Sequence, residues 1–309
     1  MAEVVSAPSA PARIPGFWPV DRLFLGYLAG VAVLIAINYG KVPGAGLLLA
    51  AHAAGIALIV AAAKAGAQAQ PVNRFHYWYP LAYIPVFYWE MGLLVPAIRT
   101  ADYDAQIASL DYRIWGAHPT VWLERLQNPP LTEFLQIAYT LFIPSVVLVA
   151  VAMWWKKLYP EFRYYGFLVA LGFLASYVGY FLVPVRGPRF FLAHLQHADL
   201  HGLWLFDSMQ SALNRLESAR FDCFPSGHTE MTMIAWWGSR FVSKRLFAAF
   251  SLYTILIVTA TVYLRYHYTV DVFAGVVLAV AVLTVSPVLC PGVPVQPRSA
   301  LNHQAEVRN

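Results

Sequence analysis

The sequence is poor in charged residues, which make up 12% of its 309 positions, whereas hydrophobic residues make up 59%. A soluble globular domain usually contains about 25% charged residues, so this composition excludes an ordinary soluble protein. We therefore predict an integral membrane protein. In such a protein the formal net charge of +5 reflects membrane topology, and we expect no nucleic-acid partner.

Cysteine is also scarce, because only Cys223 and Cys290 are present. The two residues fall at opposite sides of the predicted membrane, whereas a disulfide requires Cα atoms within about 7 Å of each other. We therefore expect no disulfide within the chain. The sequence also lacks a solenoid-type repeat and a polar insertion of domain size, which favours a single domain.

Apolar segments close to the length that crosses a bilayer, about 20 residues, recur along the chain. They predict an all-α fold, a polytopic bundle of membrane-spanning helices. The eight expected spans are residues 23–39, 44–63, 75–98, 131–155, 164–183, 226–242, 246–264 and 270–289. The span over residues 226–242 is the shortest and the most polar of the eight.

The segments outside these spans suggest an orientation. Residues 1–22 and 291–309 are predicted to be flexible tails, and the first lacks the basic start and apolar core of a cleavable signal. Short cytoplasmic loops retain lysine and arginine, and 12 of the 21 basic residues fall on the side that carries both tails. We therefore expect the tails in the cytoplasm and the opposite ends of the spans at the outer (periplasmic or lumenal) face.

The first of two candidate catalytic motifs is Pro225-Ser226-Gly227-His228, which lies where an expected span begins. Proline ends the preceding loop, serine is a favoured helix N-cap, and glycine permits the close approach of a bound group. Because the exposed N–H groups at a helix start bind anions, His228 would stand beside a phosphate and protonate a departing alkoxide. The alternative is an ordinary helix cap with a bystander histidine.

The second motif contains His267 and Asp271, at the start of the last expected span. A spacing of four residues at a helix start places both side chains on one face. A carboxylate bonded to the far imidazole nitrogen orients the ring and stabilises its cationic form, as a nucleophilic histidine requires. The pair could instead be a polar cap of the span at the level of the lipid headgroups.

Three arginines lie near the two motifs. Arg186 and Arg189 follow the 164–183 span, and Arg265 stands just before the second motif. The planar guanidinium suits the oxygens of a phosphoryl group in transfer, so these residues are candidate phosphate ligands with the serine and glycine of the first motif. Each arginine alone could equally be a snorkelling or headgroup-binding residue. Together, groups of this kind at the ends of three spans predict phosphoryl transfer on a lipid.

These motifs resemble those of the type 2 phosphatidic acid phosphatase superfamily, whose members share KxxxxxxRP, PSGH and SRxxxxxHxxxD. Residues 225–228 match the second motif in full. The third is matched at its histidine and aspartate, whereas Ala260 and Thr261 replace its Ser-Arg pair. In the first motif, Pro188-Arg189 inverts the RP order, and no lysine stands at the expected distance.

The resemblance implies a six-helix core over residues 75–290, preceded by two additional helices within residues 23–74. It also implies that His267 attacks phosphorus, Asp271 orients it and His228 protonates the leaving group, after which water or an alcohol breaks the phosphohistidine without a metal or cofactor. The altered motifs look more like the branch that contains inositolphosphorylceramide synthase. A lipid phosphatase, a headgroup transferase with a polyol or lipid alcohol acceptor, and an inactive lipid-binding or transport protein all remain open.

Several other polar residues have two interpretations. Glu90 lies inside an apolar span, where a carboxylate is costly and often functional, so it would bond to a neighbouring helix or face the site. Asp222 and Glu230 flank the first motif and would contact the hydroxyls of an acceptor or form a polar rim. The histidines and aspartate of the loop over residues 194–201 fit no zinc pattern, so we expect a solvated surface and no metal site there.

Overall fold

The computed structural model describes residues 16–68, 74–216 and 221–291. These residues form thirteen α-helices and two short 3-10 helices with no strand, and 78% of the structure is helical. The prediction of an all-α polytopic bundle is therefore confirmed. The expected tails lie largely outside the described residues, although the first helix already begins at Pro19.

Most of the expected spans are present as long apolar helices. Within the described ranges, six helices are long and apolar enough to cross a membrane: α1 (Pro19–Ile37), α2 (Ala45–Gln68), α3 (Arg74–Ile98), α8 (Tyr159–Leu182), α12 (Lys244–Tyr263) and α13 (Thr269–Leu289). The expected span at residues 131–155 is a pair of helices, α6 (Pro129–Thr140) and α7 (Phe142–Trp155), bent by 47°. Pro144 explains the bend, because its ring displaces the carbonyl four residues earlier and disfavours helical geometry before it.

The expected span at residues 226–242 is corrected by the structure. In its place α11 (Gly227–Ser239) has 13 residues, which is about 20 Å of helix and less than the roughly 30 Å of a hydrocarbon core. The helix packs against α7, α8, α12 and α13, and its polar Thr229, Glu230 and Thr232 are fully buried. Neighbouring helices therefore surround α11, which explains why this segment is both short and polar.

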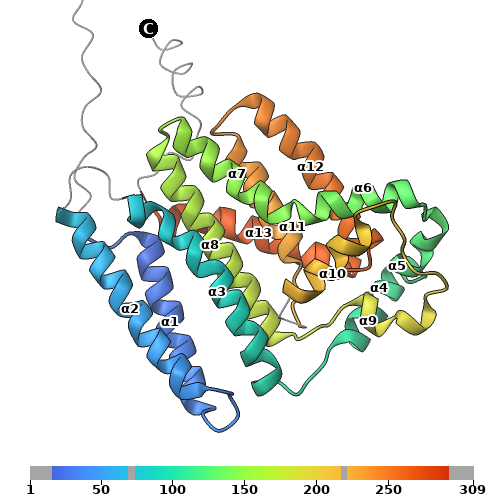
Figure 1. Cartoon of the computed structure of the whole chain (residues 1–309), viewed down its shortest axis with the longest axis horizontal. Coiled ribbons are helices and arrows are strands. Elements are labelled where there is room, and N and C mark those ends of the chain that lie inside the picture. Colours follow the sequence, from blue (N-terminus) through green and yellow to red (C-terminus); the bar gives the residue numbers. More distant parts are fainter. Residues whose placement is uncertain (1–15, 69–73, 217–220, 292–309) are drawn as a thin grey trace, which may run out of the picture.

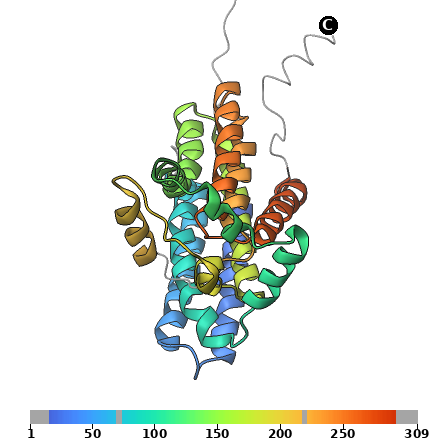
Figure 2. The same cartoon turned by 90° about the vertical axis from the view of Figure 1, so that its right-hand side faces the viewer.

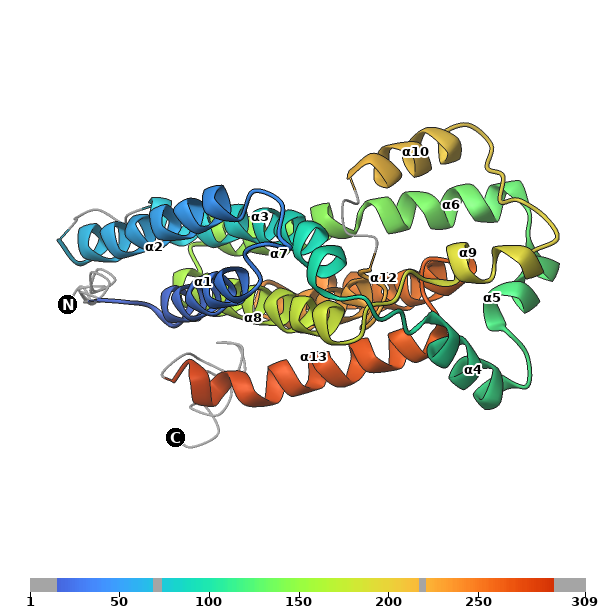
Figure 3. The ribbon, with the colours of Figure 1, turned by 90° about the horizontal axis from the view of Figure 1, so that it is seen from below.

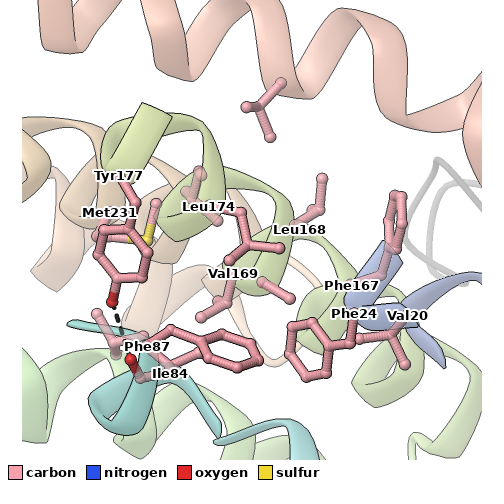
Figure 4. Close-up of a cluster of buried hydrophobic side chains, with 14 of the residues drawn as sticks. Val20, Phe24, Ile84, Phe87, Phe167, Leu168, Val169, Leu174, Tyr177 and Met231 are labelled. Atoms are coloured by element: carbon pink, nitrogen blue, oxygen red, sulfur yellow. Dashed lines mark hydrogen bonds between the residues drawn. The ribbon is translucent and has the colours of Figure 1, made fainter. Parts of the chain in front are cut away.

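The bundle is arranged around α8, which contacts α1, α3, α7, α11 and α13. The first two helices form a hairpin that packs with α1 on α8 and α2 on α3 (Figure 1). Aromatic and aliphatic side chains from α1, α3, α8 and α11 fill the interior (Figure 4). Among them, the Tyr177 hydroxyl donates to the Ile84 carbonyl at 3.0 Å, which satisfies this buried hydroxyl.

The shorter elements gather at one end of the molecule, opposite the start of α1 and the end of α13 (Figure 3). Figure 2 shows this end facing the viewer. The elements are α4 (Asp104–Trp115), α5 (Pro119–Trp122), η1 (Leu123–Leu126), α9 (Pro188–Phe191), η2 (Ala193–Leu195) and α10 (Phe206–Leu216). They come from the two long connections on the side where we expect the catalytic motifs.

Buried polar side chains link the N-terminal hairpin to α3. Glu90 pairs with His52 of α2 at 3.3 Å, and both are almost fully buried. At the other end of α3, His76 contacts the buried Asp21 carboxylate of α1 at 2.9 Å. The structure therefore places the Glu90 carboxylate against a neighbouring helix.

Candidate active site

The first motif forms the start of α11. The Ser226 hydroxyl accepts the backbone N–H of Thr229 at 3.3 Å, as a helix N-cap does, and this places His228 in the first turn. The Gly227 backbone faces α8, where a Cβ would lie 2.5 Å from the Tyr180 hydroxyl. The helix cap therefore explains the serine of this motif, and the close approach of Tyr180 explains the glycine.

The second motif forms the start of α13 and lies directly against the first. The Asp271 carboxylate accepts the backbone N–H of Tyr268 at 2.7 Å, which closes the first turn of the helix. The Ser226 N–H donates to the Asp271 carbonyl at 3.0 Å, so the two motifs share a backbone hydrogen bond. At Gly275, a Cβ would lie only 2.6 Å from the Ser226 carbonyl oxygen, which shows how closely α11 and α13 approach each other.

As a result, the two imidazoles meet. The Nε2 atom of His267 lies 3.3 Å from the Nδ1 atom of His228, although the residues are 39 positions apart. The His267 ring is 3% exposed, so the contact is shielded from bulk water. The convergence of the two histidines on one place is therefore a feature of the fold.

Hydrogen bonding determines which His267 nitrogen is free to react. Its Nδ1 lies 2.8 Å from the Cys223 backbone carbonyl, which can only accept, so Nδ1 carries the proton. In the neutral ring Nε2 then has the lone pair, and the contact between the rings is a donation from His228 Nδ1–H. The Asp271 carboxylate is 3.6 Å from His267 Nδ1, which makes it the more distant partner of that nitrogen.

Cys223 was not among the residues predicted from the sequence, yet it joins the group. Its thiol donates to the Asp271 carboxylate at 2.9 Å and lies 3.5 Å from His267 Nδ1. Burial raises the pKa of the Cys223 thiol, and the neighbouring Asp271 charge raises it further. The thiol is therefore protonated at neutral pH. Its position two residues before the first motif was the only available sequence signal.

The His228 ring is held by aromatic contacts. It stacks on Tyr139 with ring centroids 4.4 Å apart, and Tyr139 in turn stacks on Tyr266 at 4.1 Å. The Arg189 guanidinium lies over the other side of this stack, with its Cζ 4.9 Å from the Tyr266 ring centroid. Phe142 contacts the His228 ring as well, at 4.4 Å. No sequence pattern marked these aromatic residues as part of a site.

The three candidate arginines differ in their surroundings. Arg265 turns into the outer loops, where it donates to the Glu124 carboxylate at 2.9 Å and to the Ala198 carbonyl at 2.7 Å. Arg186 pairs with Asp102 at 2.8 Å on the surface. Both charges are therefore compensated, and among the three only Arg189 lies beside the aromatic stack that holds His228.

Two carboxylates flank the first motif on different sides. The Tyr88 hydroxyl donates to Asp222 at 2.6 Å. Burial raises the pKa of Asp222, whereas the Tyr88 hydrogen bond and positive charge at His267 and Arg189 act in the opposite direction. Glu230 instead accepts a short hydrogen bond from Ser176 of α8 and lies in the interface between helices.

Helix α4 fixes the turns that surround the imidazoles. Its Asp104 accepts backbone N–H groups from Arg186 at 2.7 Å and Gly187 at 2.9 Å, and the Tyr268 hydroxyl at 3.0 Å. Burial raises the pKa of Asp104 to about 6, against the effect of these hydrogen bonds. Two turns later, Asp111 accepts the Val270 N–H at 3.0 Å. These contacts hold the first turn of α13 in place.

The residues that could hold a metal differ from those considered in the sequence. His194, His197, Asp199 and His201 are exposed, as expected of a solvated loop. A group of potential ligand atoms occurs instead within the site, on Cys223, His267 and Asp271.

Comparison with known proteins places the chain in a family. The search of curated proteins and the search of solved structures gave no match. The sequence profile of the PAP2 superfamily matches residues 105–285, from α4 almost to the end of α13, and this range contains both histidine motifs. The match covers more than half of the chain, which therefore belongs to the PAP2 superfamily.

Proposed function

We propose that the protein cleaves or transfers the phosphoryl headgroup of a lipid through a phosphohistidine on His267. The contact of 3.3 Å between His267 Nε2 and His228 Nδ1 carries this proposal. It sets a nucleophilic lone pair and a proton donor side by side, which is the pairing that cleavage of a phosphate ester needs. Membership of the PAP2 superfamily supports phosphatase-type chemistry.

The proposed reaction has two steps. The His267 Nε2 attacks phosphorus, and the bond to the alkoxide breaks as that oxygen takes the Nδ1 proton of His228. For this step His228 must enter as the imidazolium, the form that a bound phosphate anion stabilises. The cationic phosphoimidazole keeps its Nδ1–H bond to the Cys223 carbonyl, and the Asp271 carboxylate 3.6 Å away stabilises the positive charge. His228, now a neutral imidazole, then accepts at Nδ1 a proton from water or an alcohol, whose oxygen attacks phosphorus and releases His267.

The surroundings of the site support a lipid substrate. The second motif begins α13, a candidate membrane span, and the first motif lies directly against it. Near this end of the bundle, Trp115, Trp122 and Trp204 are half or more exposed. Tryptophan favours the membrane interface, so phosphates at headgroup level would lie close to the imidazoles. The distribution of lysine and arginine supports an outer location for this end of the bundle.

The function is tested with purified protein and a panel of lipid phosphates and phosphodiesters. Release of phosphate or headgroup is measured with and without a candidate polyol or lipid alcohol. Product in water alone supports a phosphatase, and product that requires the alcohol supports a transferase. Absence of both reactions across the panel would instead support an inactive lipid-binding protein.

The acid role of His228 leads to a prediction about leaving groups. We expect His228→Gln to lose about 10²- to 10⁴-fold of the activity toward an alkyl phosphate, because its alkoxide needs a proton to depart. An aryl phosphate with an acidic phenol needs no such proton and should lose far less. The measurement is the ratio of kcat/KM for the two substrates in both proteins. Equal losses on both substrates would contradict the acid role.

An alcohol acceptor is favoured by one observation, the Asp222 carboxyl that accepts the Tyr88 hydroxyl and stands three residues before the first motif. A carboxylate there could orient the hydroxyl of an acceptor and draw its proton. This alternative corresponds to a headgroup transferase of the inositolphosphorylceramide synthase type. It assigns Asp222, rather than Glu230 or Glu90, to the acceptor, since those two face other helices.

Replacement of Asp222 distinguishes transfer from hydrolysis. We expect Asp222→Asn to lower transfer to an alcohol at least about tenfold and to lower hydrolysis less. Because burial raises the pKa of Asp222, wild-type transfer should increase as pH rises through that pKa and decrease below it, and the Asn variant should lack this dependence. Asp199→Asn, in an exposed loop, is the control. An unchanged product ratio in Asp222→Asn would exclude this role.

A further inference from the structure

Three buried ligand atoms meet on the far side of His267 from His228. The Cys223 Sγ, His267 Nδ1 and Asp271 carboxylate oxygen lie within 4.8 Å of one another, and each residue is at most 3% exposed. Thiolate, imidazole and carboxylate are all zinc ligands. We propose that this group is an inhibitory binding site for a thiophilic divalent cation such as Zn²⁺. The inhibitory effect rests on the function proposed above, whereas the binding does not.

The distances between the ligand atoms fit this role. The Sγ–Nδ1 distance is 3.5 Å and the Nδ1–Oδ2 distance is 3.6 Å. A tetrahedral zinc ion with bonds of about 2.0–2.3 Å separates its ligand atoms by roughly 3.4–3.6 Å. The Sγ–Oδ2 distance of 2.9 Å is shorter because a thiol proton lies between the atoms. Loss of that proton on metal binding would turn attraction into repulsion and open this distance.

The Asp271 carboxylate has one oxygen without a partner among the described residues. Its Oδ1 atom is fully buried and has no hydrogen-bond partner in the described part of the chain. An unsatisfied carboxylate oxygen in the interior is costly, and a cation that the carboxylate binds through both of its oxygens would relieve that cost. The site thus has three ligands of the correct types, together with spare acceptor capacity on one of them.

Metal binding at this place would stop the proposed reaction by a defined route. A cation on Nδ1 requires that nitrogen's lone pair, so the imidazole proton moves from Nδ1 to Nε2 and the hydrogen bond from Nδ1 to the Cys223 carbonyl is lost as that oxygen is displaced. The Cys223 thiol proton leaves to solvent. The Nε2 atom then carries hydrogen and has no lone pair for phosphorus. The same cation also occupies the Asp271 carboxylate that would stabilise the phosphoimidazole.

The binding is tested spectroscopically on tag-free, metal-depleted protein in detergent. Addition of Co²⁺ should produce a thiolate-to-cobalt charge-transfer band in wild type and in Cys290→Ser, which removes the other cysteine. Cys223→Ser should lack the band. No band in wild type, or an unchanged band in Cys223→Ser, would overturn the proposal.

A measurement without any change at residue 223 covers the case in which the variant misfolds. X-ray absorption of Zn²⁺-loaded Cys290→Ser should show one sulfur ligand at about 2.3 Å. Because this variant has a single cysteine, that sulfur would be Cys223 or a methionine thioether, and the cobalt charge-transfer band identifies the thiolate. A zinc site with nitrogen and oxygen ligands alone would contradict the proposal.

Inhibition of lipid phosphate cleavage by Zn²⁺ is measured separately from metal binding, so that the site and the proposed function can fail independently. We expect Zn²⁺ to inhibit lipid phosphate cleavage equally in wild type and Cys290→Ser, and the inhibiting concentration to rise at least about tenfold in Cys223→Ser. A cobalt band without any lipid phosphate activity would refute the function and leave the site intact. Activity that Zn²⁺ does not inhibit, despite a cobalt band, would refute the inhibitory role.

Discussion

His267→Ala is expected to abolish lipid phosphate cleavage, with a loss of at least about 10⁴-fold in kcat. The side chain supplies the attacking Nε2, whose lone pair is set by the 2.8 Å bond from Nδ1 to the Cys223 carbonyl. No neighbouring group in the proposed mechanism can replace it, because His228 approaches as a proton donor. The measurement is phosphate release, together with an acid-labile phosphoenzyme trapped by rapid quenching of wild type.

The control for this variant is His194→Ala, which alters an exposed histidine of the outer loops. It should retain wild-type cleavage and wild-type phosphoenzyme, and both variants should elute as wild type on size exclusion. If His267→Ala cleaves substrate at the wild-type rate, His267 is not the nucleophile. If it folds and is inactive but wild type forms no phosphoenzyme, the covalent step is wrong although the residue is essential.

Gly275→Ala should strongly reduce both activity and stability. A Cβ at this position would lie 2.6 Å from the Ser226 carbonyl oxygen, a backbone atom that cannot rotate away. Helix α13 must therefore move away from α11, and the shared hydrogen bond from Ser226 N–H to the Asp271 carbonyl is strained. Overpacking of this kind costs about 1–3 kcal/mol, and misplacement of the histidines by about 1 Å can cost roughly 100-fold in rate.

The matched control is Gly166→Ala in α8, where an added Cβ would meet no atom within 4 Å. Alanine in a helix interior is favoured over glycine by about 0.5–1 kcal/mol, so this variant should be unchanged or slightly more stable. Thermal unfolding in detergent and phosphate release are compared for the two variants. Wild-type behaviour of Gly275→Ala in both assays would show that the close approach of the helices is unnecessary.

Much of the architecture followed from composition and hydropathy. An apolar segment of about 20 residues has few alternatives to a helix in lipid, because its backbone groups must be satisfied within the segment. For that reason six spans agree with long helices. The 13-residue α11 was the exception, since a helix surrounded by other helices can be short and polar. Hydropathy also could not show the 47° bend between α6 and α7.

The site was only partly predictable. His228, His267 and Asp271 could be found because their types and spacing match a chemical requirement, and the structure brings them together. Cys223 and Tyr139 could not be found, because a single cysteine or tyrosine in an apolar chain has no distinguishing pattern. Their roles arise from contacts with residues at least 44 positions away.

The sequence alone determined that this protein is a helical membrane protein with two histidine motifs, because lipid solvation and local helix capping act over short stretches of chain. The tertiary structure decided which charges are available near those motifs. Arg265 stands two residues before His267, yet its guanidinium is paired with Glu124 in another loop. Partners of this kind depend on how distant segments pack, and no local pattern encodes them.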